Sequence, residues 1–179
     1  MRAVRIILII GGLISFSFLT EKWYLFESKE FGFTILFPKK PTEQSQNVES
    51  AIGPLKLNLF LYEGANDPMD ENYVYGVNYT EYPDSLFINI DSTTMSNFFR
   101  GSIDGMVGNV KGELLSEKTI ELKGFPGREV KASLMNGAAI IKARLYLIEN
   151  KMYMIETITD TKKDSNQSID KFFNSFQLQ

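Results

Sequence analysis

The side chains that carry most enzyme chemistry are missing from this 179-residue chain. It contains no Cys and no His, which excludes thiolate nucleophiles, Cys/His zinc sites and acid or base catalysis by histidine. It has no GxGxxG or P-loop glycine pattern, and Ser116, Glu117 and Lys118 lack the spacing of an S-x-x-K nucleophile. The sequence therefore predicts a protein that is not an enzyme. A hydrolase that uses two converging carboxylates is the remaining enzymatic alternative.

Carboxylates are densest in one predicted loop, 66–72, which contains Asp67, Asp70 and Glu71. Their oxygen atoms could bind Ca²⁺, but the spacing differs from that of an EF-hand loop. We therefore favour a solvated acidic loop over a metal site. No metal and no cofactor is expected.

Arg128 is the first candidate for a binding surface. It alternates with Glu129 along a predicted strand, so the two side chains lie on opposite faces. A guanidinium group can bind a carboxylate or phosphate with two hydrogen bonds. We favour a structural role instead, in which Arg128 pairs with Glu121 or Glu156 from a neighbouring strand.

Arg144 is the second candidate, and it shares a strand face with Lys142, Ile140 and Tyr146. Two basic residues on one face could bind an anion. A solvated sheet face is the favoured interpretation, because exposed strand faces commonly carry such residues.

Tyrosines provide the remaining candidates. Tyr73, Tyr75 and Tyr79 fall on one face of a predicted strand together with Val77. Tyrosine combines an apolar ring with a polar tip, which suits contact with a ligand or a partner. A packed core face is favoured over a recognition surface, because Val77 shares the row. As an alternative function, a small ligand could bind in a crevice between sheet and helix lined by Tyr73, Tyr75, Phe98 and Phe99.

The N-terminal segment differs from the rest of the chain. After Arg2 and Arg5, residues 6–19 (IILIIGGLISFSFL) carry no charge. As a helix they would span about 21 Å, which is shorter than the roughly 30 Å hydrocarbon core of a membrane. This pattern is typical of a signal peptide for export. The region 15–20 lacks a small-x-small cleavage motif, so an uncleaved N-terminal anchor is the alternative.

We therefore divide the chain into residues 1–20, a signal peptide or anchor, and residues 21–179, a single domain. Without the first segment, 17 basic and 22 acidic residues leave a net charge of −5. The longest basic runs are the pairs Lys39-Lys40 and Lys162-Lys163, so no nucleic-acid partner is expected. Membrane contact is expected only through the N-terminal segment, if it is uncleaved.

Hydrophobic periodicity predicts an α+β fold, an antiparallel sheet flanked by helices. The predicted sheet contains strands 33–37, 57–62, 73–79, 130–135, 141–148 and 152–158. A hairpin at Gly53-Pro54 joins 48–52 to 55–62, a further strand covers 114–122, and 124–127 (GFPG) is a turn.

Two helices are expected to cover this sheet. The first begins at Asp91 or Ser92 and ends near Gly108. Gly101 and Gly105 lie inside it, and close approach to a neighbouring element would compensate for their low helix propensity. The second helix places Ile169, Phe172, Phe173 and Phe176 on one face, which should be buried against the sheet.

The order of elements resembles a known family. The segments that carry the resemblance are 31–38 (FGFTILFP), 124–129 (GFPGRE), 144–155 (RLYLIENKMYMI) and 172–178 (FFNSFQL), with the Gly53-Pro54 hairpin and the helix near Phe98-Phe99. These look like the small PsbP/Mog1-like proteins of bacteria, over about residues 31–178. The resemblance implies an α/β/α sandwich.

Functions of the family are not implied by these segments. Plant photosystem members assist the oxygen-evolving complex and Mog1 members bind a small GTPase, but no residue here matches an interaction motif of either. The expected function is that of an exported, non-enzymatic domain which binds a protein partner or acts as an accessory factor at the cell envelope. Small-ligand binding is the alternative.

Overall fold

The computed structural model describes residues 22–50 and 52–179, and its centre is a seven-stranded sheet in which every pair of neighbours is antiparallel. In spatial order its strands are β3 (Thr42–Ser50), β4 (Gly53–Tyr62), β5 (Asn72–Glu81), β9 (Lys151–Asp160), β8 (Ala139–Ile148), β7 (Phe125–Leu134) and β6 (Glu113–Leu122). A smaller sheet contains β1 (Tyr24–Ser28), β2 (Phe33–Phe37) and β10 (Gln177–Leu178). The helices are α1 (Ser92–Asn109) and α2 (Gln167–Asn174).

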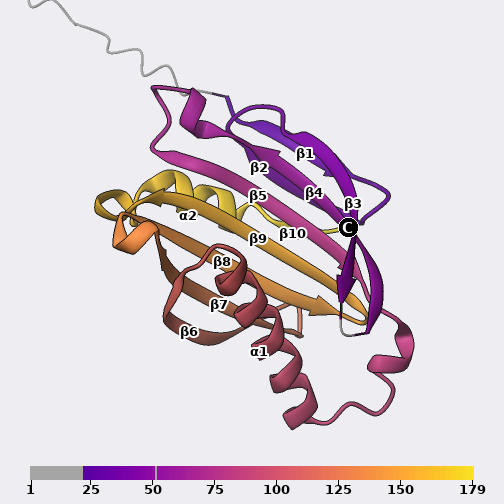
Figure 1. Cartoon of the computed structure of the whole chain (residues 1–179). Helices are drawn as coiled ribbons and strands as arrows, with labels where there is room; N and C mark the ends of the chain where they lie inside the picture. The colour runs from indigo at the N-terminus through magenta and orange to yellow at the C-terminus, as the bar shows by residue number, and fades with distance from the viewer. Residues whose placement is uncertain (1–21, 51) are drawn as a thin grey trace, which may run out of the picture.

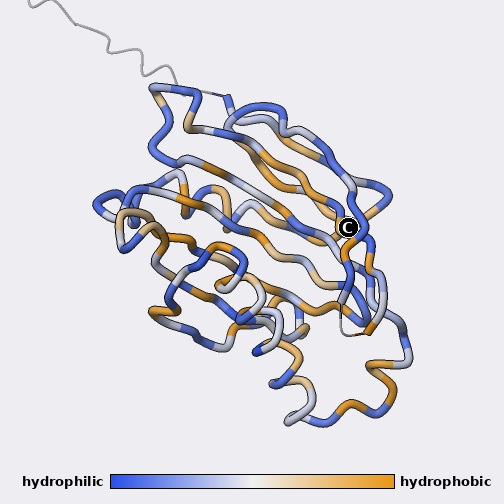
Figure 2. The backbone as a smooth tube through the Cα atoms, viewed as in Figure 1, coloured by the Kyte–Doolittle hydropathy of each residue, from blue (hydrophilic) through white to orange (hydrophobic). Residues whose placement is uncertain are grey.

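The large sheet separates two hydrophobic cores. On one side, α2 and the small sheet cover residues from β4, β5 and β9, including Phe60, Tyr75 and Ile155. On the other side, α1 packs through Phe99 and Ile103 on residues from β7 and β8. Figure 1 shows the two helices on opposite sides of the large sheet, and Figure 2 shows hydrophobic residues recurring along its strands. The predicted α+β architecture is confirmed.

One strand of the predicted sheet lies elsewhere. Residues 33–37 form β2, which pairs with β1 and β10 in the small sheet rather than joining the large one. Phe33, Ile35 and Phe37 are fully buried. Alternation in a sequence indicates that one strand face is buried, but it carries no information about which strands are neighbours.

The turn predicted at 124–127 is also shorter than expected. Lys123 and Gly124 have φ angles of 52° and 88°, and β7 already begins at Phe125. Positive φ at both central residues is typical of a two-residue type I′ hairpin. Gly127 therefore lies within the sheet.

Helix α1 begins as expected, because the Asp91 side chain accepts a hydrogen bond from the Thr94 amide. It ends at Asn109, just beyond the predicted Gly108. The expectation for its glycines is wrong. A Cβ atom at Gly101 or Gly105 would meet nothing within 4 Å, so neither glycine permits a close approach.

Helix α2 follows its prediction in part. Ile169, Phe172 and Phe173 are buried on it, and Asn166 caps the first turn by accepting from the Ile169 amide. Phe176 is also buried, but it lies beyond the end of the helix at Asn174. No helix in the described part of the chain is long and apolar enough to span a membrane. The predicted signal segment lies outside the described residues.

Candidate binding site

Helix α1 packs mainly on β7 and β8, and the same face of β4 and β5 has no helix over it (Figure 1). Along β4, Asn58 and Phe60 point toward the side of the large sheet that the small sheet covers, and both are buried. The intervening leucines point the other way and are only half-buried; they are Leu55, Leu57, Leu59 and Leu61. We call these four residues the leucine row.

A groove lies between the leucine row and α1. Its volume is about 530 Å³. Gly101 and Gly105 form part of its helical wall, and because they have no side chains they leave the space open. The opposite wall comes from β3, β4, β5, β8 and β9 and includes Leu57, Met154 and Ile158. The two glycines have no close neighbour because they face the groove.

Two polar side chains on the neighbouring strands β5 and β9 form a hydrogen-bonded pair in the groove. The Asn78 side-chain amide donates to Glu156 Oε1 at 3.1 Å, and both residues line the groove. Asn78 Oδ1 is buried and has no hydrogen-bond partner among the described residues. Burial raises the pKa of Glu156, while the hydrogen bond from Asn78 acts in the opposite direction. No Lys or Arg is among the described residues that line the groove.

The raised pKa of Glu156 predicts a pH-dependent effect of Glu156→Gln. An unfolded chain releases this proton near the ordinary pKa of about 4.3, whereas the folded chain retains it to higher pH. Wild-type stability therefore falls as pH rises through that interval, and the glutamine variant avoids the loss. Relative to wild type, Glu156→Gln should gain melting temperature as the pH rises above the ordinary glutamate pKa toward the raised pKa of folded Glu156. A difference that stays constant with pH would contradict this.

Two of the predicted tyrosines face away from the groove. Tyr75 and Tyr79 are buried in the core beneath α2 and the small sheet, and burial raises the pKa of both. Tyr73 lies at an irregularity in the pairing of β5 with β9 and is 39% exposed. That irregularity breaks the period of two, so the three tyrosines do not share a face. The favoured core interpretation holds for Tyr75 and Tyr79.

The predicted crevice of Tyr73, Tyr75, Phe98 and Phe99 is therefore wrong. Tyr75 belongs to the core on the α2 side of the sheet, whereas Phe99 belongs to the core beneath α1. Both rings are fully buried. The sheet itself separates Tyr75 from Phe99, and the observed groove is lined by other side chains.

Two carboxylates of the acidic loop, those of Asp67 and Asp70, have partners within the protein. Asp67 forms an ion pair with Lys39 at 2.5 Å and accepts from the Met69 amide; the bond from Lys39 is the main cause of the lowered pKa of Asp67. Asp70 accepts from the Tyr75 hydroxyl at 2.8 Å and from the Asn72 amide. Within residues 22–50 and 52–179, no three acidic side chains are grouped to hold a metal ion.

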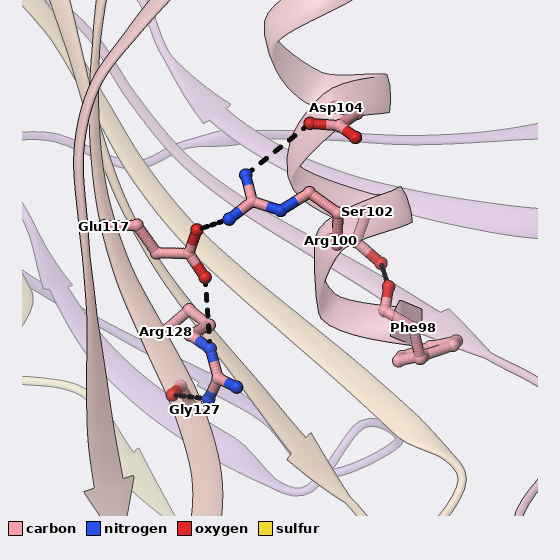
Figure 3. A network of polar contacts seen from close by, with 7 residues as sticks. All are labelled: Phe98, Arg100, Ser102, Asp104, Glu117, Gly127 and Arg128. Atoms are coloured by element: carbon pink, nitrogen blue, oxygen red, sulfur yellow. Dashed lines mark hydrogen bonds and ion pairs between the residues drawn. The ribbon is translucent and has the colours of Figure 1, made fainter. Parts of the chain in front are cut away.

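Arg128 has a structural partner, but a different one from those predicted. Its Nε donates to Glu117 Oε1 at 3.2 Å, and Arg100 of α1 binds the other oxygen of the same carboxylate (Figure 3). The Arg128 guanidinium also lies 4.7 Å from the centre of the Phe99 ring. Glu121 and Glu156 were the wrong partners. The network ties α1 to β6 and β7.

Arg144 lies on the opposite face of the sheet. Its Nε donates to Glu129 at 2.8 Å, and its guanidinium lies 5.1 Å from the Phe173 ring of α2. Lys142, on the same face, donates to the Asp164 carbonyl. The predicted solvated face is therefore wrong, because α2 and the loop before it cover these residues. The five predicted site residues do not form one surface.

Sequence reasoning missed the groove, although one signal was available. Within the strand 152–158, Glu156 occupies the same face as Met152, Met154 and Ile158. A single carboxylate in an apolar row is unusual, because burying a charge without a partner is costly. The open space beside it depends on the placement of α1, which the sequence does not specify.

Comparison with protein-family models and with curated proteins gives no match. Among solved structures, the chain is similar to the solution structure of cyanobacterial PsbP (CyanoP) from Synechocystis sp. PCC 6803, with a TM-score of 0.58. The alignment covers 95% of this chain and 99% of that one at 12% sequence identity. The chain has a PsbP-like fold. At this identity the likeness shows the fold of the PsbP-like domain and assigns no function to its groove.

Proposed function

We propose that this PsbP-like domain is non-enzymatic and acts by binding, as an accessory factor at the cell envelope. The observation that carries the proposal is the half-covered face of the large sheet, where the leucine row and the groove lie side by side. Apolar surface of this kind on a soluble domain commonly marks an interaction site. The absence of Cys and His from the sequence also favours binding over catalysis.

A protein partner is the first candidate occupant. Leu59 and Leu61 continue the leucine row beyond the groove, so the half-buried apolar strip is longer than the groove itself. A partner segment laid along β4 beside α1 would cover the strip and complete the layer of elements on that face. Such a segment would bury all four leucines, which a ligand confined to the groove would not do.

Export supports an envelope location for that partner. Its basis is the sequence of residues 1–20, with two arginines followed by the uncharged run 6–19. Fractionation of tagged full-length protein should recover the chain outside the cytoplasm. Recovery in the cytosol alone would contradict both the export and the envelope partner.

Photocrosslinking tests the proposed binding face. A photoreactive amino acid at Gly105 should fit without displacing any neighbour, because a Cβ there has open space. In cells, it should form an adduct with an envelope protein, whereas the same amino acid at exposed Lys163 should not. Leu59→Glu should weaken the adduct. Equal yields from Gly105 and Lys163, or none from Gly105, would contradict a protein partner on this face.

A small ligand is the second candidate occupant. The groove volume of about 530 Å³ lies within the usual range for small-molecule sites. Glu156 provides a polar group among apolar walls, the combination that fixes the orientation of a bound ligand. This candidate keeps the binding function but replaces the protein partner by a small molecule.

A further inference from the structure

The chemistry of the groove walls restricts the class of ligand. Met106, Met152 and Met154 line it together with Leu57 and Ile158. Methionine side chains adapt their shape and contact apolar groups favourably. The walls therefore suit a ligand with an apolar body, and the flexibility of three methionines would let the groove adjust to its outline.

The charges of the groove are of one sign. Glu49 and Glu156 line it, whereas no Lys or Arg is found among its described lining residues. Among the described residues, the Glu156 side chain accepts a hydrogen bond from Asn78 and forms no ion pair. By contrast, Asp67, Glu117 and Glu129 each form an ion pair with a basic side chain. Glu156 is thus a carboxylate in apolar surroundings whose missing partner would be a cation.

A cationic ligand would supply what this carboxylate lacks. An ionised carboxylate is costly to bury unless it is paired and hydrogen-bonded. An ammonium group offers both a charge and N–H donors, and charge-assisted hydrogen bonds are stronger than neutral ones. An anionic ligand would instead meet two carboxylates.

We propose that the groove binds a primary amine carried on an apolar body, with its ammonium group donating to the Glu156 carboxylate. The apolar body lies against the three methionines and the glycine wall of α1. Glu49, at the end of β3, adds a second negative charge near the same site. The inference rests on the second candidate function, in which the occupant of the groove is a small molecule.

Three probes with one apolar body test the proposal: 4-phenylbutylamine, 4-phenylbutan-1-ol and 4-phenylbutyrate. Each is titrated into the full-length chain labelled with ¹³C at its methionine methyl groups. The amine should shift the Met106, Met152 and Met154 signals. The signals of Met69 and Met135, which are 81% and 72% exposed, should stay in place. The amine should bind about tenfold more tightly than the alcohol, and the carboxylate should bind more weakly than both.

Two variants distinguish the contribution of the Glu156 charge to binding from that of the shape of the groove. Glu156→Gln should reduce the affinity for the amine about tenfold and leave the affinity for the alcohol unchanged. Gly105→Leu should fill the groove and weaken both. Glu121→Gln, at an exposed position on β6, is the matched control and should bind the amine as the wild type does.

The proposal is overturned if the carboxylate binds as tightly as the amine, or if Glu156→Gln binds the amine unchanged. Shifts of Met69 and Met135 equal to those of the groove methionines would also overturn it, because they would indicate non-specific association. A protein adduct at Gly105 combined with no amine binding would refute this inference and leave the binding function standing. Amine binding without a protein adduct would support the inference and refute the protein partner.

Discussion

Phe172→Ala is expected to lower the free energy of unfolding by about 3 to 5 kcal/mol. Phe172 is fully buried, and its ring lies 5.1 Å from the Phe37 ring and 5.2 Å from the Tyr75 ring, measured between centroids. These contacts join α2 to the small sheet and to the large sheet. Truncation would leave a cavity where the three elements meet, and surrounding residues of two sheets cannot readily collapse into it.

Such a loss is large for a domain whose total stability is about 5 to 15 kcal/mol. At about 2 to 4 °C per kcal/mol for a domain of this size, the melting temperature should fall by roughly 10 °C. Gln167→Ala, at an exposed position of the same helix, is the control and should change it little. If Phe172→Ala melted within about a degree of wild type, α2 would contribute little to the core.

Phe173→Ala should have a smaller effect than Phe172→Ala. The Phe173 side chain keeps 7% of its surface exposed, and its outer side meets the Arg144 guanidinium. Both aromatic residues were predicted to be buried from their helical spacing alone. The spacing did not show that the Phe173 ring would contact the Arg144 guanidinium group.

The sequence predicted those features that depend on local periodicity. The buried aromatic residues of α2, the cap at Asp91 and most strands of the large sheet follow from residues close in the chain. The hairpin predicted at Gly53-Pro54 is an exception, because β3 extends back to Thr42 and both turn residues lie within β4. Features that depend on distant segments were missed. The alternation in strand 33–37 predicts a buried face but does not distinguish the two sheets. One of the two strands that pair with it, β10, is only 2 residues long.

At the candidate site, too, local features were predicted and features that depend on distant segments were missed. Arg128 was correctly expected to favour an ion pair within the sheet, but its partner Glu117 lies diagonally across from it rather than directly opposite. Tyr73 left the predicted row because of an irregularity in strand pairing, which hydrophobic alternation does not reveal. The groove depends on α1 covering one part of the sheet and leaving another open. That is a property of the tertiary arrangement.

The GFPG segment gives the second large expected effect, in Gly127→Ala. Gly127 pairs with Tyr146 of β8. A Cβ atom at position 127 would lie 2.6 Å from the Leu145 carbonyl oxygen and 2.7 Å from the Tyr146 ring. The ring cannot move away easily, because Tyr146 is 7% exposed and stacks on Phe176 at an angle of 5°.

The alanine methyl group must therefore push β7 and β8 apart or displace the Tyr146 ring. Overpacking of this kind costs about 1 to 3 kcal/mol, and displacing a backbone carbonyl within the ladder places Gly127→Ala at the upper end of that range. The expected fall in melting temperature is roughly 6 to 12 °C. Thermal unfolding followed by circular dichroism measures it directly.

Gly101→Ala is the matched control, since it makes the same chemical change in a different setting. A Cβ atom at Gly101 meets nothing within 4 Å, and the residue lies in the interior of α1. Alanine is favoured over glycine there by about 1 kcal/mol, so this variant should melt at a higher temperature than wild type. Opposite signs for the two substitutions would show that Gly127 is required by close packing against Tyr146. If Gly127→Ala were neutral, the second half of the GFPG segment would be a turn, as its sequence first indicated, and not part of β7.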